Sequence, residues 1–340
     1  MRAIVLDTAG ATPAWSERND LVPPELEETE VVVEVEAAAL NRADLEEIAG
    51  TYATAQRRSD RPHVAGSDLA GVVVAVGSAV SGIEPGDRVM AMVDGAFADF
   101  VAFDHRVALP VPDTLDWAEA AALPSALMTE YDALIDQGRL APGQRVLITA
   151  ATSGVGLLAV DIAQWAGAEQ VFATTTSPQK ELLLTARGAQ AINTRVDDLA
   201  ATVIAATGGA GVDLVIDHVG GPLLDECIAA SRIGGTVVQV GRAGGPVSVI
   251  DVDRLAYRRV RLLGTTFRTR GTADRARIAE GIRTRLMPAV ADRRIRPHVH
   301  LVLPAAQARQ ALDELADAGS AGKIVLDFGN RRHGDRETDA

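Results

Sequence analysis

Hydrophobic and polar positions follow two different patterns along this chain of 340 residues. From residue 1 to about 120, short runs rich in β-branched residues lie between turn-forming residues, a pattern typical of strands. The clearest runs are EVVVEVEAAAL (30–40), GVVVAVG (71–77) and MAMVDGAFADFVAF (90–103). In the last run Asp94-Gly95 separates two strand-like halves, which predicts a hairpin. We expect the second strand of this hairpin to end before LPVPD (109–113), because its two prolines break regular pairing.

From about residue 122 the pattern changes to strand-like and helix-like runs that alternate. The predicted strands cover residues 145–150, 170–176, 190–193, 212–217, 236–241 and 259–267. The predicted helices between them cover 155–167, 177–188 and 221–234. Repeated strand–helix units of this length favour a parallel sheet with helices on both faces. The sequence therefore predicts an α/β fold in which a doubly wound Rossmann sheet follows a β-rich part.

The C-terminal part continues with a predicted helix over 272–292, a strand over 298–305, a helix over 304–318 and a final strand over 323–328. This block is too small to form a core of its own, so we predict that it packs on the N-terminal β-rich part. The remaining tail, residues 331–340, is polar and without periodicity, and we expect it to be disordered.

Charge and cysteine content disfavour several kinds of partner and site. The chain has 33 Lys and Arg against 46 Asp and Glu, which gives a formal charge of −13. A surface of that sign repels phosphate backbones and anionic lipids and so disfavours nucleic-acid and membrane partners. The single cysteine, Cys227, lies in an apolar helical context and is predicted to be a core residue. We see neither a signal-peptide pattern nor an apolar run of about 18 residues, so we expect a cytoplasmic protein.

The turn AATSGVG (150–156) is the first candidate for chemistry, because it directly follows the predicted strand RVLI. Aligned to the G-x-G-x-x-G pattern of dinucleotide sites, it places Ala151 first, Ser153 second and Gly156 last. Ser153 can cap the following helix, and its hydroxyl can donate to a phosphate oxygen. Backbone N–H groups at the helix start can bind an anion. A small-residue turn before a buried helix is the alternative, but the surrounding strand–helix–strand order favours nucleotide binding.

The end of the second predicted strand indicates which nucleotide binds. NAD sites usually place a carboxylate there to bind the ribose hydroxyls, whereas this strand ends in ATTTSPQK (173–180) without one. The hydroxyl groups of Thr175, Thr176 and Ser177 and the cation of Lys180 suit a 2′-phosphate instead. We therefore predict NADPH as the cofactor. The alternative is that Ser177 only caps the next helix and that Lys180 is a solvated surface residue.

Several stretches in order resemble the medium-chain dehydrogenase/reductase superfamily. They are NRADL (41–45), AGSDLAGVVVAVG (65–77), GDRVMAM (86–92), EAAALPSALMTEYDAL (119–134), TSGVG (152–156), GVDLVIDHVGG (211–221) and GKIVLDF (322–328). Within it the chain is most similar to the zinc-free NADPH:quinone oxidoreductases that include zeta-crystallin, and to their tumour-suppressor-inducible subgroup. The resemblance implies a GroES-like catalytic domain (1–121 and 269–330) and a Rossmann NADPH-binding domain (122–268).

The resemblance also allows a test for zinc. Zinc-dependent relatives have a cysteine at the place of Asn41, a histidine at Ser67 and a second cysteine near Ser125. All three positions lack the thiolate or imidazole that a zinc site of this type needs, and the cysteines of the structural zinc site are missing too. We therefore predict that the protein holds no metal, which disfavours zinc-dependent alcohol oxidation.

Site residues carried over from the resemblance fall into a catalytic and a cofactor-binding set. Asn41 matches an asparagine near the nicotinamide ribose, Tyr52 a tyrosine facing the substrate cleft, and Thr129 a threonine beside the nicotinamide ring. The cofactor set adds Ser153, Gly154, Val155 and Gly156 at the pyrophosphate, Thr175, Thr176, Ser177, Lys180 and Thr194 around the 2′-phosphate, and Gly241, Phe267 and Arg268 along the cofactor.

Three positions depart from the family pattern. Thr194 stands where the family usually has a tyrosine near the adenosine phosphate, and Arg195 can compensate electrostatically. The loop 51–63 is more charged than usual, so substrate choice can differ from that of the family. His218 stands where the family does not usually have histidine, and we interpret it as a hydrogen-bonded residue at a strand end.

The resemblance implies NADPH-dependent reduction of a conjugated carbonyl acceptor, in the first place a quinone, with Tyr52 as a candidate hydrogen-bond donor or proton relay. Two alternatives stay open. One is an enone or enoyl-thioester reductase, and the other is a non-catalytic NADPH-binding protein of the crystallin kind. Relatives often pair through the edge strand of the nucleotide domain, here VRLLGTTF (260–267), which implies a homodimer.

Overall fold

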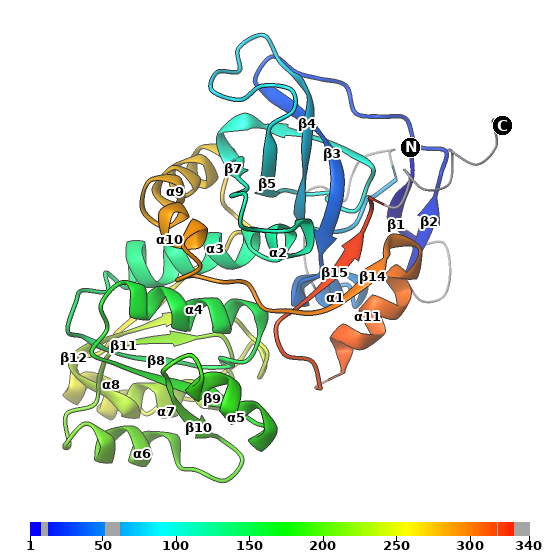
Figure 1. Cartoon of the computed structure of the whole chain (residues 1–340). Helices are drawn as coiled ribbons and strands as arrows, with labels where there is room; N and C mark the ends of the chain where they lie inside the picture. Colours follow the sequence, from blue (N-terminus) through cyan, green and yellow to red (C-terminus); the bar gives the residue numbers. More distant parts are fainter. Residues whose placement is uncertain (8–12, 52–61, 318, 330–340) are drawn as a thin grey trace, which may run out of the picture. The chain divides into compact units, whose positions relative to one another are not determined.

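The structure is a computed structural model that describes residues 1–7, 13–51, 62–317 and 319–329. It divides into two compact units (Figure 1). Unit 1 comprises Met1–Met128, Arg268–Arg293 and Pro297–Ala340, and unit 2 comprises Thr129–Phe267 and Arg294–Arg296. The predicted disorder of residues 331–340 lies outside the described residues.

Unit 2 is built on a six-stranded sheet in the order β10-β9-β8-β11-β12-β13, and every neighbouring pair is parallel. The strands are β8 (Arg145–Ile148), β9 (Gln170–Thr175), β10 (Gln190–Asn193), β11 (Val212–Asp217), β12 (Ser231–Gln239) and β13 (Arg261–Gly264). This arrangement confirms the predicted parallel sheet. Since the strand order reverses between the adjacent strands β8 and β11, their carboxyl ends form the place where doubly wound sheets bind ligands.

Helices connect the parallel strands of unit 2. They are α4 (Gly154–Trp165), α5 (Pro178–Thr185), α6 (Leu199–Ala206), α7 (Leu223–Ala230) and α8 (Val252–Arg258). Helix α4 covers one face of the sheet and α7 the other (Figure 1). Helix α6 was not predicted, because its sequence LAATVIAA is apolar at nearly every position and marks no polar face. The helix predicted over 221–234 ends early, since the chain enters β12 directly at Ser231.

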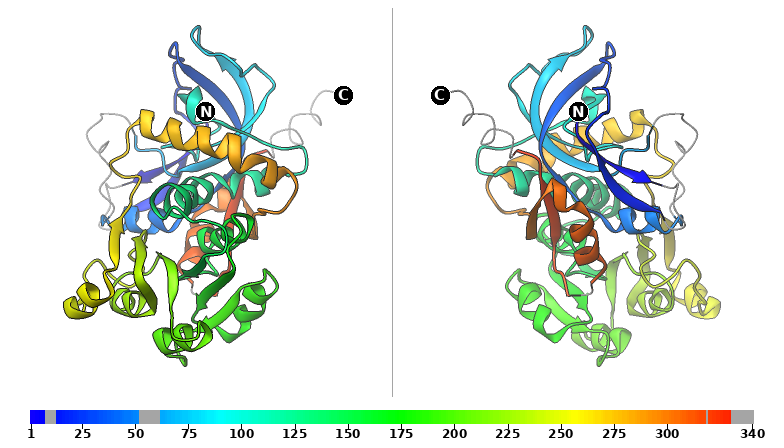
Figure 2. Two further views of the ribbon diagram at one scale, coloured as in Figure 1. Left: turned by 90° about the vertical axis from the view of Figure 1, so that its left-hand side faces the viewer. Right: turned by 90° about the vertical axis from the view of Figure 1, so that its right-hand side faces the viewer.

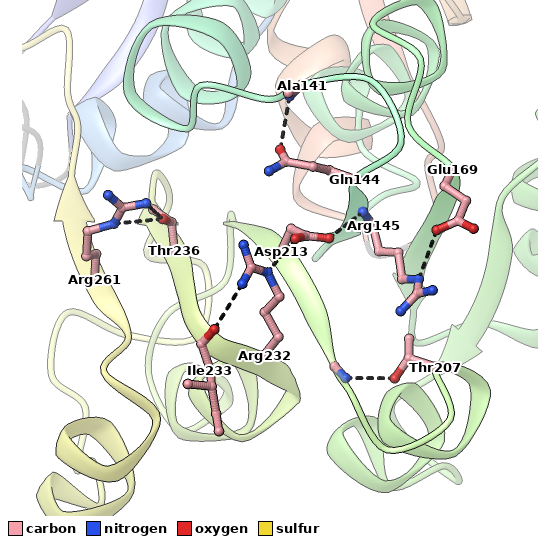
Figure 3. Close-up of polar contacts among 11 residues, drawn as sticks. Ala141, Gln144, Arg145, Glu169, Thr207, Asp213, Arg232, Ile233, Thr236 and Arg261 are labelled. Carbon is pink, nitrogen blue, oxygen red and sulfur yellow. Dashed lines mark hydrogen bonds and ion pairs between the residues drawn. The ribbon is translucent and has the colours of Figure 1, made fainter.

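The amino ends of the same strands are joined by arginine contacts (Figure 3). Asp213 accepts hydrogen bonds from the backbone N–H of Arg145 at 2.9 Å and from the guanidinium of Arg232. Arg261 donates to the hydroxyl of Thr236 on the neighbouring strand at 3.0 Å. These polar contacts tie the amino ends together, on the edge opposite to the carboxyl ends of the strands.

Unit 1 contains a seven-stranded sheet in the order β14-β15-β3-β4-β5-β7, with β6 paired to β3. The strands are β3 (Glu30–Ala39), β4 (Asp68–Val76), β5 (Arg88–Met92), β6 (Phe100–Asp104), β7 (Leu109–Pro110), β14 (Val299–Pro304) and β15 (Lys323–Asp327), beside a small sheet of β1 (Ala3–Asp7) and β2 (Ala14–Arg18). The long strands β3 and β4 run side by side in both views of Figure 2. Because β15 pairs with β3, the C-terminal block does pack on the N-terminal part, as predicted.

The predicted hairpin at Asp94-Gly95 is wrong. The two residues lie in a turn, but β5 pairs with β4 and β7, and β6 pairs with β3. The segment after the turn is held elsewhere, because the N–H groups of Gly95 and Phe97 donate to the carbonyls of Gly66 and Ala65. Pro110 also lies within a strand, the two-residue β7, where its missing N–H is tolerated at the sheet edge.

The helices of unit 1 lie around this sheet, apart from the last residues of α3. They are α1 (Arg42–Ile48), α2 (Trp117–Ala121), α3 (Pro124–Glu130), α9 (Thr272–Arg285), α10 (Met287–Ala291) and α11 (Ala308–Ala316). The single helix predicted over 272–292 is two helices, because Pro288 at the start of α10 interrupts the hydrogen-bond ladder. The chain continues from α3 into a π-helical segment, Tyr131–Gln137, in unit 2. No helix among the described residues is both long and apolar enough to cross a membrane.

Candidate functional site

The turn after β8 has the backbone geometry of an anion-binding site. Ala150 has a φ of 46°, in the left-handed region that L-residues adopt rarely, and such strain is often found at functional sites. Its N–H donates to the Thr174 hydroxyl on β9, which anchors the turn to the sheet. Helix α4 begins at Gly154, so the N–H groups of its first turn, Gly154 and Val155 included, have no acceptor within the helix.

Gly156 is the glycine that this turn requires. A Cβ atom there would lie 2.5 Å from the Ala150 carbonyl oxygen and 2.6 Å from the Ala151 Cα, both backbone atoms that cannot turn away. The close approach brings the start of α4 against the end of β8, the packing role that the third glycine has in a dinucleotide turn.

Ser153 is the N-cap of α4, as predicted, and its Oγ accepts the Gly156 N–H at 3.1 Å. That its hydroxyl donates to a phosphate oxygen of a bound cofactor stays a prediction. The Ser153 hydroxyl donates to the Ala150 carbonyl at 2.9 Å, so its hydrogen stabilises the turn itself.

The candidates for the 2′-phosphate gather where β9 and β10 end. The two strands are parallel, with Asn193 opposite Thr175, and the Thr194 N–H donates to the Thr175 carbonyl at 3.0 Å. Thr176 and Arg195 are exposed, and Lys180 is half-buried on the first turn of α5. The structure thus brings the residues after β9 next to those after β10, at the edge that holds the α4 turn.

Two hydroxyls of that set are engaged within the protein. Thr175 is buried, and its Oγ1 accepts the Ser177 N–H at 3.2 Å. Ser177 is the N-cap residue of α5 by backbone position, but its hydroxyl donates to the Gln179 side chain at 2.8 Å rather than capping the helix. The nearby carboxylate of Glu181 accepts a hydrogen bond from the Asn193 amide at 3.0 Å.

A buried pair, Glu130 and His218, lies at the carboxyl ends of the two central strands. The His218 Nε2 is 2.7 Å from Glu130 Oε1, and its Nδ1 is 2.8 Å from the Thr149 carbonyl oxygen. Since a carbonyl only accepts, Nδ1 carries a hydrogen. Burial lowers the pKa of His218, but the Glu130 charge and hydrogen bond, helped by the Thr149 carbonyl and Asp217, raise it above its ordinary value overall.

This pair is adjacent to Thr129, the half-buried candidate for the nicotinamide contact. His218 is hydrogen-bonded at a strand end, which confirms its predicted role. Gly241 follows β12 next to it, and a Cβ on Gly241 would lie 2.1 Å from the His218 carbonyl oxygen. Phe267 is the last residue of the long segment of unit 2. The Arg268 guanidinium donates to Glu46 Oε2 on α1 at 2.7 Å. Cys227 is fully buried, as predicted.

In unit 1 the three positions of the zinc ligands come together around Asp68. Its Oδ1 accepts the backbone N–H and the hydroxyl of Ser125, at 2.8 and 2.5 Å. Its Oδ2 accepts the Asn41 Nδ2 at 3.0 Å and the Lys323 ammonium at 2.8 Å. Asn41 also donates to the Ser67 Oγ at 3.1 Å and accepts from Lys323 at 2.6 Å through its Oδ1. We call these five residues the Asp68 network.

The Asp68 network does not have the donor set of a zinc site. The oxygen atoms best suited to a metal, Asp68 Oδ2 and Asn41 Oδ1, both accept hydrogen bonds from the Lys323 ammonium. The other groups are hydroxyls, and thiolate and imidazole are missing from the three ligand positions. A positive side chain therefore lies beside these positions, where it disfavours a second cation.

Asp44 lies on α1 next to the Asp68 network, and its Oδ2 accepts the Asn41 backbone N–H at 2.6 Å. Burial raises the pKa of Asp44 to about 7, against the Asn41 hydrogen bond and Lys323, which lower it, while Glu47 and Asp68 add to the rise. The folded protein therefore holds a proton here between about pH 4 and 7 that the unfolded chain releases.

We expect stability to fall as pH rises through this window, because the folded-state pKa lies above the unfolded one. Asp44→Asn should remove this contribution and raise the free energy of unfolding near pH 8 by up to about 4 kcal/mol. Urea unfolding at pH 4.5 and 8 measures this change in stability, with Asp113→Asn at a fully exposed carboxyl as the control. An Asp44→Asn protein with the wild-type pH dependence would contradict the assignment.

Of the predicted site residues, Tyr52 lies outside the described residues.

Sequence reasoning missed Glu130, Asp68 and Lys323 as site residues. Asp68 and Lys323 lie in stretches that carried the family resemblance, but nothing in their spacing shows that residues 255 positions apart meet. The pairing of Glu130 with His218 joins residues 88 positions apart and has no local signal either.

Comparison with known proteins identifies the family of this chain. Residues 27–113 match the alcohol dehydrogenase GroES-like domain, and residues 154–282 match the zinc-binding dehydrogenase family. A solved NAD-dependent alcohol dehydrogenase is 30% identical, with a TM-score of 0.82 over 97% of this chain and 100% of that one. The chain belongs to the medium-chain dehydrogenase/reductase superfamily, with its GroES-like domain and Rossmann-type parallel sheet.

Other relatives within the superfamily include quinone oxidoreductases, an enoyl reductase and a polyketide synthase protein. Quinone oxidoreductase of Rattus norvegicus is 27% identical over 96% of this chain and 97% of that protein, and a Pseudomonas syringae quinone oxidoreductase structure is 28% identical, with a TM-score of 0.83 over 96% and 99%. The CurK enoyl reductase structure is 26% identical, with a TM-score of 0.82 over 96% and 98%. The polyketide synthase protein NorB of Streptomyces orinoci is 34% identical over 87% of this chain, which spans only 13% of NorB.

Proposed function

We propose that the protein is an NADPH-dependent, zinc-independent reductase that transfers hydride to a quinone or a similar conjugated carbonyl compound. The Asp68 network is the observation that carries this proposal. It has an amide and two hydroxyl groups at the three positions where zinc-dependent relatives have metal ligands, and the Lys323 ammonium lies beside them. Reduction of an acceptor that takes up electrons readily needs position and hydrogen bonds more than a metal. The similarity to quinone oxidoreductases supports the same reaction.

The reduced nicotinamide, when bound, supplies the hydride. The protein binds and orients the cofactor at the carboxyl edge of the unit 2 sheet. The N–H groups at the start of α4 are suited to the pyrophosphate, because they lack acceptors within the helix and lie at its positive end. Lys180 and Arg195, at the ends of neighbouring strand–helix connections, are suited to the 2′-phosphate.

Removal of Lys180 tests the choice of cofactor. We expect Lys180→Ala to weaken NADPH binding roughly 10- to 100-fold, since a charge-assisted hydrogen bond to phosphate is lost, and to leave NADH binding unchanged. Arg195→Ala should act in the same direction and more weakly, because Arg195 is exposed. Fluorescence titration with both nucleotides measures the two affinities. The control is Arg309→Ala, which removes an exposed cation from α11. Equal losses for NADPH and NADH would contradict a 2′-phosphate contact.

A second candidate is reduction of an enoyl thioester or another conjugated double bond. The similarity to the CurK enoyl reductase and to polyketide synthase proteins favours it as strongly as the other relatives favour quinones. This reaction needs a proton after hydride transfer, and Tyr52 is the candidate donor. Tyr52→Phe should therefore slow the reduction of enoyl thioesters more than that of quinones, in assays that use both acceptors.

The remaining sequence predictions belong to the same proposal. Asn41 and Thr129 lie near the nicotinamide, and Gly241, Phe267 and Arg268 border the cofactor. Residues 1–121 and 269–330 form the catalytic domain, and 122–268 the NADPH-binding domain. A homodimer would use β13, the edge strand of its sheet, on which Leu262 is 39% exposed. A cytoplasmic location stays a prediction.

A further inference from the structure

The orientation of the Asn41 side chain in the Asp68 network is fixed by its neighbours. The Lys323 ammonium has only donors, so the Asn41 atom that faces it at 2.6 Å is the carbonyl oxygen. Asp68 Oδ2 accepts, so the atom that faces it at 3.0 Å is the amide nitrogen. The second amide hydrogen therefore points to Ser67 Oγ, which accepts it at 3.1 Å.

This orientation leaves the Ser67 hydroxyl hydrogen available. Ser67 Oγ already accepts from Asn41, and within the part of the chain that the structure describes no group accepts the Ser67 hydroxyl hydrogen. Ser125 differs, because its hydroxyl hydrogen is directed to Asp68 Oδ1 at 2.5 Å. Ser67 is also half-buried, whereas Lys323 and Asp68 behind it are buried. Ser67 is thus the member of the network that can donate outward.

The three groups form a chain of hydrogen bonds that begins at a buried positive charge. Lys323 donates to Asn41, and Asn41 donates to Ser67. Each bond in such a chain polarises the next, so the Ser67 hydroxyl becomes a stronger donor than an isolated serine. A donor held in place before the reaction stabilises negative charge that develops on an oxygen atom.

We propose that Ser67 is a catalytic residue that donates a hydrogen bond to the carbonyl oxygen of the acceptor, with Asn41 and Lys323 as positioning residues. The inference rests on the proposed function, because hydride transfer to a conjugated carbonyl places its electron pair on that oxygen. No bond to Ser67 is made or broken. The chain from Lys323 supplies by hydrogen bonding the polarisation of the oxygen that a metal supplies in zinc enzymes.

The test uses 4-nitrophenol, whose phenolate carries a negative oxygen on a ring and has an absorption spectrum distinct from the phenol. The full chain is titrated with and without NADP⁺. We expect the wild type to bind the phenolate and to lower the apparent pKa of the bound phenol. Ser67→Val should bind it roughly 10- to 100-fold more weakly. Ser67→Thr, which has the same shape as valine and keeps the hydroxyl, should retain the wild-type affinity.

Equal affinities of the valine and threonine variants, or no phenolate binding by the wild type, would overturn the inference. A folded Lys323→Met protein, checked by circular dichroism, should also bind the phenolate more weakly. Full affinity in that variant would contradict the positioning role of Lys323. If that variant does not fold, the Ser67 pair decides alone. The titration without NADP⁺ is independent of turnover. If the wild type reduces quinones while Ser67→Val binds the phenolate normally, only this inference is contradicted. If Ser67→Val binds the phenolate weakly while the wild type does not reduce quinones, the proposed function is contradicted.

Discussion

Gly156→Val should abolish most cofactor binding while leaving unit 1 intact. The valine Cβ would lie 2.5 Å from the Ala150 carbonyl oxygen and 2.6 Å from the Ala151 Cα, so the start of α4 must move away from β8. Overpacking of this kind costs about 1–3 kcal/mol. The movement also displaces the N–H groups that would hold the pyrophosphate. We expect NADPH affinity to fall by roughly 100-fold, together with a lower melting temperature.

Isothermal titration with NADPH and thermal unfolding measure the two effects of Gly156→Val. Gly271→Val is the matched control, because a Cβ on Gly271 would meet nothing within 4 Å. The control should retain the wild-type affinity. If Gly156→Val binds NADPH as well as the control does, the α4 turn is not the pyrophosphate site.

His218→Leu should destabilise the protein by about 3–5 kcal/mol, because it leaves the buried Glu130 carboxyl without its hydrogen-bond partner. Glu130 is 0% exposed, so water cannot replace the lost hydrogen bond. The double variant Glu130→Leu with His218→Leu should recover most of this loss, since an apolar pair needs no partner.

Denaturant unfolding of the two single variants and the double variant gives the coupling free energy of the pair. Additive effects would contradict a direct interaction between the two buried side chains. The same series tests cofactor binding, because Glu130 follows Thr129 directly in the chain. A single variant that stays folded should also bind NADPH more weakly.

The parallel sheet, the return of the C-terminal block and the turn at 150–156 were predictable from the sequence. Each depends on local signals, namely periodicity, β-branched runs and small residues at fixed spacing. The resemblance added the three metal positions. The structure links Asn41 and Ser125 through Asp68, and Asn41 also donates to Ser67.

Long-range pairing was the part that the sequence did not predict. The residues around Asp94-Gly95 have the local signal of a hairpin, but Gly66 and Ala65 take up the hydrogen bonds of the turn and direct β6 to β3. Lys323 meets Asn41 only because β15 pairs with β3. The hydroxyl of Ser153 is used within its own turn, which depends on a backbone angle at Ala150 that no residue type signals.

The most direct test of the proposed activity is anaerobic oxidation of NADPH, with NADH in parallel, by an ortho-quinone in the presence of a metal chelator. We expect rapid consumption of NADPH, much slower consumption of NADH, and rates that the chelator does not change. NADPH that binds without being consumed would contradict the quinone assignment and favour enoyl thioesters or a non-catalytic role. An activity that the chelator abolishes and zinc restores would contradict the function assigned to the Asp68 network.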